Sequence, residues 1–163
     1  MSKQQPIEIF MPPNMLKAKV GGRITGLDMA AIKRGEEALV NLKTEFENWI
    51  SADTARLSAA RDAYSAERGE ETHNSLFRAS HDFRSQALTF GYPLAARVAE
   101  SLCKLLDGGG SAVPVTLVDA HVDAIRIIVR QEIRHTEDKT THALVSELDA
   151  RVSEYLEKPE SKD

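Results

Sequence analysis

The stretch that decides the fold is residues 72–90, which read THNSLFRASHDFRSQALTF. Its apolar residues recur every three or four positions, the spacing that places side chains on one face of an α-helix. This face consists of Leu76, Ala79, Phe83, Ala87 and Phe90. Gly91 follows directly, and Pro93 comes two positions later, which is typical of one helix ending and the next one beginning. The stretch therefore predicts an amphipathic helix with one buried side.

The same periodicity continues on both sides of this helix, and no segment alternates as a strand does. It predicts a helix over residues 28–66, with a kink or break near 51–53, and further helices over 93–106, 114–133 and 140–155. Residues 107–111, DGGGS, predict a flexible loop. We expect one core that contains Phe46, Trp49, Phe83 and Leu102.

The expected fold is all-α: an antiparallel four-helix bundle with an N-terminal arm and an additional C-terminal helix. The arm takes residues 1–26, the bundle residues 27–136, and the last helix with a frayed tail residues 137–163. A chain of 163 residues has room for little more than one such domain.

Composition and charge exclude several classes of function. The net charge is −4, which argues against nucleic acid as the main partner. No apolar run approaches the ~20 residues of a membrane span, and residues 1–10 lack the core of a signal peptide. Cys103 is the single cysteine, so an internal disulfide and a multi-cysteine metal site are excluded. We expect a cytoplasmic protein that binds neither membranes nor nucleic acid.

His81 is the most informative residue of the helix over 72–90. At ~100° per residue it points about 150° away from the centre of the buried face, and we therefore expect it to face solvent. Its neighbours on the helix surface are Phe77, Arg84, Ser85 and Leu88. Two large apolar side chains beside an exposed histidine indicate a docking surface for another protein. The alternative is that Phe77 and Leu88 pack under the arm or the last helix.

A neutral imidazole suits the acceptance of a phosphoryl group. With an ordinary pKa near ~6.5, one ring nitrogen of His81 keeps its lone pair at pH 7. Arg84, one turn later, is placed to bind the oxygens of the transferred group, although it could instead only pair with a nearby acid. His121 fits a hydrogen-bonded residue at the boundary of its helix better than it fits a second acceptor.

Residues 81–91, HDFRSQALTFG, resemble the signature of histidine-containing phosphotransfer (HPt) domains. These four-helix bundles pass phosphoryl groups between receiver-domain aspartates in bacterial two-component phosphorelays. The family pattern is His, any residue, an apolar residue, Lys or Arg, then Gly, with a further Gly ten residues after the histidine. The resemblance covers residues 76–106, where SLCKLL at 101–106 is similar to the family's Leu-Cys helix.

The resemblance implies a role for each matching residue. His81 is the phosphoacceptor, Arg84 its basic neighbour, Phe83 the inward apolar residue and Gly91 the closing glycine. Ser85 departs from the pattern, because the family has glycine there, and the larger side chain slightly crowds the approach of a receiver. Phe77, Ser85 and Leu88 are the expected partner-binding residues.

Two functions follow as expectations. In the first, the chain is a phosphorelay intermediate without a kinase domain of its own, and it exchanges phosphoryl groups at His81 with response-regulator receivers and a sensor histidine kinase. It then binds no metal or cofactor, because the receiver supplies the Mg²⁺. In the second, it is a non-catalytic adaptor or dimerisation module made of helices. A Lys or Arg three residues after an exposed histidine, together with a Gly ten residues after it, favours the first, since an adaptor needs neither.

Overall fold

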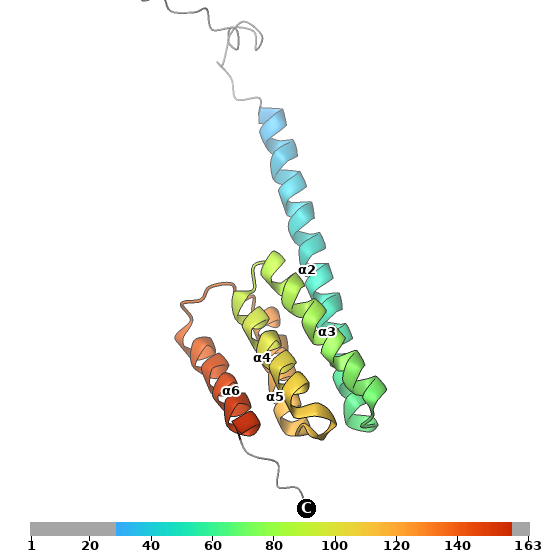
Figure 1. The fold of residues 1–163 in the computed structure, drawn as a ribbon. Coiled ribbons are helices and arrows are strands. Elements are labelled where there is room, and N and C mark those ends of the chain that lie inside the picture. The colour runs from blue at the N-terminus through green and yellow to red at the C-terminus, as the bar shows by residue number, and fades with distance from the viewer. Residues whose placement is uncertain (1–28, 158–163) are drawn as a thin grey trace, which may run out of the picture. The chain divides into compact units, whose positions relative to one another are not determined.

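The computed structural model describes residues 29–157, apart from the side chain of Ser111, and every regular element among them is helical (Figure 1). The elements are α2 (Met29–Ala66), α3 (Glu70–Thr89), α4 (Pro93–Gly109), the 3-10 turn η1 (Gly110–Ala112), α5 (Val115–Arg130) and α6 (Lys139–Glu157). The expected arm over residues 1–26 and the tail over 158–163 lie outside the described residues. The chain divides into two units, residues 1–41 and 42–163.

No helix within residues 29–157 combines the length and the apolar character that crossing a bilayer requires.

α2 runs without interruption through residues 51–53, where the sequence predicts a kink or a break. Its buried residues Ile50, Leu57 and Tyr64 are seven positions apart and hold one face of the helix on the core. Thr54 Oγ1 donates to the carbonyl of Ile50 at 2.7 Å, a bond made inside the helix. Burial on both sides of Asp53 therefore stabilises the helix across this polar position.

α3 begins two residues before its predicted start. Gly69 is the N-cap, and its backbone N–H donates to Thr72 Oγ1 at 3.1 Å. The Thr72 hydroxyl donates to the carbonyl of Glu67 at 2.7 Å. Glu70 and Glu71 lie in the first turn, where the helix dipole favours negative charge. These bonds and charges stabilise the first turn of α3 and explain its earlier start.

α4 is the most buried helix and contacts α3, α5 and α6 (Figure 1). Two ion pairs connect different helices of the bundle. Arg97 Nη2 lies 2.7 Å from a carboxylate oxygen of Asp149 on α6. A second pair connects α2 to α5, where Arg61 Nη1 lies 3.0 Å from Asp119 Oδ1. Apolar side chains from all five α-helices meet in one core, so residues 42–157 form a helical bundle.

The glycine run after α4 is not the flexible loop that the sequence predicts, because Gly108 and Gly109 belong to the helix. A Cβ on Gly108 would lie 2.7 Å from a side-chain carbon of Leu156. A Cβ on Gly109 would lie 2.6 Å from Val113 and 2.9 Å from Tyr155. These glycines allow the end of α6 to approach the backbone of α4, a packing role that cancels their low helix propensity.

The expectation that Trp49 belongs to the core is wrong. Its side chain is 50% exposed, whereas Phe83 and Leu102 are fully buried and Phe46 is half-buried. The Trp49 ring lies 5.6 Å from the Phe46 ring and 6.1 Å from the Phe90 ring, measured between centroids. The three rings form an aromatic cluster at the edge of the core, and one side of Trp49 stays in water.

α3 ends in a Schellman motif centred on Gly91, whose φ is +79°. The N–H of Gly91 donates to the carbonyl of Leu88 at 3.2 Å, and the N–H of Tyr92 donates to that of Ala87 at 2.7 Å. Arg134 Nη1 adds a bond of 3.0 Å to the carbonyl of Phe90. The left-handed conformation, and not a lack of space, is what requires glycine here, because the nearest atom to an added Cβ is 4.0 Å away.

The same motif ends α5, but a glutamate occupies the left-handed position. Glu132 has a φ of +51°, and its N–H donates to Val129 O at 3.1 Å while that of Ile133 donates to Ile128 O at 3.0 Å. The two motifs thus have the same hydrogen bonds, but the residue with positive φ is a glycine in one and a glutamate in the other.

We expect Gly91→Ala to lower the free energy of unfolding by about 1–2 kcal/mol, because a Cβ is strained at positive φ. Glu132→Gly is expected to raise it by about 0.5–1 kcal/mol, since the relief of strain exceeds the added freedom of the unfolded chain. Urea unfolding of both variants tests this. A loss of stability in Glu132→Gly would show that the glutamate side chain stabilises this end of α5.

Candidate functional site

The candidate site lies on the exposed face of α3. The buried face of this helix consists of Leu76, Ser80, Phe83 and Ala87. Ser80 is polar, but its hydroxyl donates to the carbonyl of Leu76 at 2.8 Å and so needs no partner from another helix. The burial of this face places the next residue, His81, on the outside, as the helical spacing predicts.

The imidazole of His81 is accessible, with 56% of its side chain exposed. Its Nδ1 lies 3.8 Å from Asp82 Oδ1, which is too far for a hydrogen bond. A neutral imidazole keeps the lone pair on one of its two ring nitrogens. His81 therefore presents a nucleophilic nitrogen that a partner protein can reach.

Arg84 is half-buried beside His81, one helical turn toward the end of α3. Among residues 29–157 no carboxylate forms an ion pair with Arg84, so the described part of the chain does not bear out the alternative that it pairs with an acid. Its charge acts on Cys103 of α4: burial raises the pKa of that thiol to about 11, and Arg84 opposes the rise. The guanidinium is therefore close enough to α4 to act on this thiol, and a guanidinium carries five N–H donors with which it can bind an anion.

The small residue next to the site is Ser85. Its side chain is exposed, and its hydroxyl donates to the carbonyl of His81 at 3.4 Å. This bond is made inside the helix, so the side chain lies against α3. A hydroxymethyl group held in this way adds little bulk beside the imidazole.

The two apolar residues of the expected docking surface differ in exposure. Leu88 is 60% exposed, whereas Phe77 is half-buried and packs against the core. Phe77 directly follows the buried Leu76, so it lies at the edge of the apolar face, where a large ring reaches the core. Phe77 therefore offers only part of its ring to a partner. Leu88 is the apolar side chain that α3 leaves in water next to His81.

Phe83 and Gly91 hold the site in shape. The Phe83 ring is buried in the core on the side of α3 opposite His81. Gly91 closes the helix through the Schellman motif, ten residues after the histidine. One residue anchors the helix and the other ends it, and neither is placed to touch a partner at His81.

His121 is fully buried, and the expected boundary position is therefore wrong. Its Nδ1 lies 2.7 Å from the carbonyl of Leu117 and its Nε2 lies 3.2 Å from Ser101 Oγ. A carbonyl only accepts, so Nδ1–H donates to Leu117 and the Ser101 hydroxyl donates to Nε2. With both nitrogens bonded inside the core, His121 has no access to a phosphoryl donor. The sequence could have shown this, because Val118, Val122 and Ile125 lie on the same face of α5.

Burial lowers the pKa of His121 below its ordinary value of ~6.5, although the bond to Leu117 and the charge of Asp149 oppose the shift. The unfolded chain therefore binds a proton at His121 below about pH 6.5 that the folded chain does not bind. We expect the free energy of unfolding to fall as the pH drops from 7 to 5. His121→Gln is expected to reduce this slope in urea unfolding. The exposed His135 provides the control, and an equal reduction in His135→Gln would contradict the assignment.

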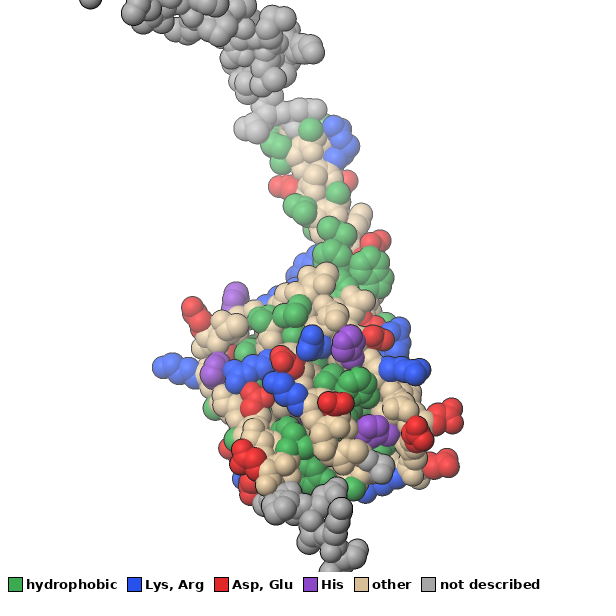
Figure 2. All heavy atoms as spheres, viewed as in Figure 1, with side chains coloured by type: hydrophobic (Ala, Val, Ile, Leu, Met, Phe, Trp, Pro, Cys, Tyr) green, Lys and Arg blue, Asp and Glu red, His purple; other side chains and the backbone are tan. Residues whose placement is uncertain are grey.

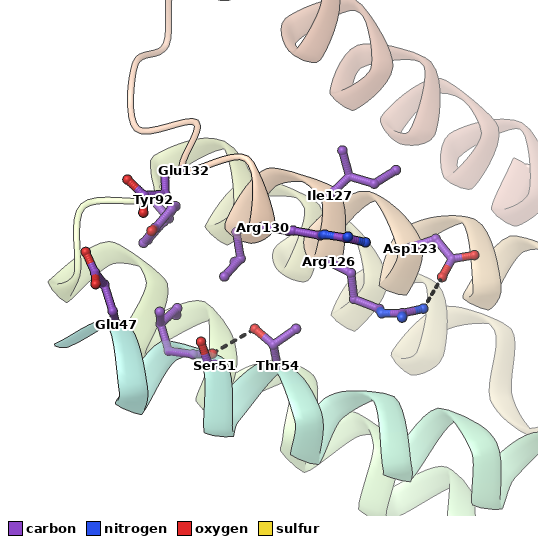
Figure 3. A pocket seen from close by; sticks show the side chains of 11 residues that line it. Glu47, Ser51, Thr54, Tyr92, Asp123, Arg126, Ile127, Arg130 and Glu132 are labelled. Atoms are coloured by element: carbon purple, nitrogen blue, oxygen red, sulfur yellow. Dashed lines mark hydrogen bonds and ion pairs between the residues drawn. The ribbon is translucent and has the colours of Figure 1, made fainter. Parts of the chain in front are cut away.

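A hollow of about 710 Å³ lies between α2 and α5, and none of its lining residues belongs to α3 (Figure 3). Arg126 and Arg130 line one side, and Arg126 Nη1 lies 3.1 Å from Asp123 Oδ1. This pairing neutralises part of the positive charge that an anion would need. Residues 29–157 hold no group of three or more His, Cys, Asp or Glu residues arranged to bind a metal ion.

Lys and Arg side chains alternate with Asp and Glu over the face shown in Figure 2, so charge of one sign does not dominate it. Ion pairs elsewhere in the described residues include Arg97 with Asp149 at 2.7 Å and Lys104 with Glu100 at 3.3 Å. This mixture of charges suits contact with another folded protein better than contact with a polyanion.

No family model, no curated protein and no solved structure matches the chain.

Proposed function

We propose that the chain is a phosphorelay intermediate of the HPt type. In this proposal α2 to α5 form an antiparallel four-helix bundle, and His81 on α3 accepts a phosphoryl group from the aspartyl phosphate of a receiver domain and passes it to another receiver. The partners are cytoplasmic receivers and, upstream, a sensor histidine kinase. The observation that carries the proposal is an exposed imidazole with a cation one turn away that no described carboxylate neutralises.

The transfer step uses the groups that α3 presents. The lone pair of His81 Nε2 attacks phosphorus, the N–P bond forms, and the P–O bond to the aspartate breaks, with its electron pair remaining on the carboxylate. Asp82, 3.8 Å from Nδ1, stabilises the positive charge that develops on the ring. Arg84 donates hydrogen bonds to the phosphoryl oxygens during transfer. The Mg²⁺ and the acidic pocket belong to the receiver.

The receiver docks on the side chains that α3 exposes around His81. Leu88 provides apolar area beside His81, Ser85 leaves room for the approach, and Phe77 contributes the edge of a ring that is already anchored in the core. A rigid helix that presents the nucleophile limits the entropy lost on association. The bundle thus acts as a support that holds one imidazole in a fixed position.

The experiment is incubation of the full chain with a phosphorylated receiver and Mg²⁺. We expect one phosphoryl group per chain that is labile in acid and stable in base, as a phosphoramidate is. Absence of label from every receiver of the source organism would favour the adaptor, which binds partners without phosphotransfer. The exposed Leu88 is the observation that supports the adaptor as the second candidate function, because an exposed leucine can bind a partner protein in either function.

A further inference from the structure

α2 carries a line of apolar positions and one glycine that the core covers only at one end, where Phe46 packs against it. Counted along the helix, they alternate in steps of three and four, and we call them the α2 seam: Ile32, Gly35, Leu39, Leu42, Phe46 and Trp49. The exposed fractions of Leu39, Leu42 and Trp49 are 67%, 42% and 50%. Figure 2 shows apolar side chains exposed along this helix. Steps of three and four are the a and d positions of a heptad repeat, with which a helix packs along a second helix.

We propose that the α2 seam binds the same seam of a second copy of this chain as an antiparallel two-stranded coiled coil. In an antiparallel pair each a position faces a d position of the other helix. With the register centred between residues 40 and 41, Leu39 faces Leu42 of the second copy and Ile32 faces its Trp49. Gly35 then faces Phe46 of the second copy, so the smallest side chain of the seam meets one of the largest.

A parallel pair fits the same residues poorly. It would place Gly35 against Gly35, which leaves a gap, and Trp49 against Trp49, which doubles the bulk in one layer. Space around Gly35 is open in the single copy, since a Cβ there would meet no atom within 4 Å. The seam alone therefore favours the antiparallel direction, because only that direction places the large Phe46 against the small Gly35 and keeps the two Trp49 rings in separate layers.

The charged residues beside the seam also favour the antiparallel orientation of the two helices. Glu36 and Lys43 both occupy the e position beside it. In an antiparallel pair e faces e, so Glu36 of each copy meets Lys43 of the other, and two complementary pairs form. In a parallel pair Glu36 and Lys43 would face Ala31 and Ala38 instead. In the single copy the exposed Lys43 lies 3.4 Å from the half-buried Glu47, a contact within one helix that an intermolecular pair can replace.

The helix is formed before it associates. α2 is a continuous helix, and its buried residues Ile50, Leu57 and Tyr64 anchor it in the core. An isolated helix as long as the seam is marginal in water, and its ordering would weaken binding. The bundle already orders the later part of α2, where Phe46 and the buried residues lie, so the seam extends a helix that is already nucleated. The proposal does not depend on phosphotransfer at His81.

Sedimentation velocity of the full chain across a range of concentrations tests the proposal. We expect a dimer of twice 18.0 kDa. Leu39→Glu is expected to weaken dimerisation roughly a hundredfold, because it places a carboxylate in the seam. Leu88→Glu is the matched control: it changes an equally exposed leucine on α3, and we expect the dimer to persist. Both side chains lie in water in the single copy, so circular dichroism should show folded protein for both variants.

Two further variants test the direction of the pair. Glu36→Lys and Lys43→Glu are each expected to weaken the dimer roughly three- to tenfold, and an equimolar mixture of the two variants to restore it. Gly35→Leu is expected to weaken an antiparallel dimer, whose Phe46 already fills that space, and would strengthen a parallel one. A chain that is monomeric at all concentrations, or a dimer that survives Leu39→Glu, would overturn the proposal.

Discussion

His81→Gln abolishes phosphoryl labelling of the chain, which is the largest effect we expect. Glutamine has no nitrogen lone pair that can attack phosphorus, and His121, the other histidine weighed as an acceptor, is fully buried with both ring nitrogens bonded. Since the His81 side chain is 56% exposed, the substitution should change the free energy of unfolding by no more than about 0.5 kcal/mol. The phosphoryl label is identified by its lability in acid and its stability in base, and urea unfolding is measured on the same variant. Together the two measurements distinguish loss of the nucleophile from loss of the fold.

Arg84→Ala is the companion variant, and we expect slower transfer without loss of the site. A charge-assisted hydrogen bond is worth about 1.5–3 kcal/mol, which corresponds to roughly 10- to 100-fold in rate. Arg84→Lys recovers most of the rate if a point charge is sufficient, and little if both arms of the guanidinium are used. Ser85→Gly should be neutral or faster, because it clears space beside His81. Label that persists in His81→Gln would refute the assignment of the acceptor.

The second large effect concerns stability. Phe83→Ala is expected to lower the free energy of unfolding by about 3–5 kcal/mol, because it removes a buried ring and leaves a cavity on the inner side of α3. Leu88→Ala, five residues later on the same helix and 60% exposed, is the control, with an expected change within about 0.5 kcal/mol. Urea unfolding measures both. Similar values for the two variants would mean that α3 does not bury the face that contains Phe83.

The variants at His81 and Phe83 distinguish the phosphoacceptor of α3 from the buried residue that holds the helix on the core. His81 and Phe83 are two residues apart and point to opposite sides of α3, one toward partners and the other into the core. A change at His81 should therefore leave folding intact, and a change at Phe83 should act through stability. This division is what a carrier requires, because its nucleophile must be exposed while the helix that holds it stays rigid.

Periodicity alone predicted the all-helical fold, the buried face of α3 and the exposure of His81. These properties follow from 3.6 residues per turn and from the partition of apolar side chains, both of which are local. The position of Gly91 was predictable for a similar reason, since the end of a helix calls for a residue that tolerates positive φ.

Tertiary structure alone decided how deeply the residues at the edge of an apolar helix face are buried. Trp49 and Phe77 both lie at the edge of an apolar face, yet Phe77 reaches the core and half of Trp49 stays in water. Gly108 and Gly109 remain helical because the end of α6 packs against them, a contact between residues about 47 positions apart in the chain. A sequence pattern fixes which side chains share a face of one helix. How far each is buried depends on the neighbouring helix that covers the face, and long-range packing determines that.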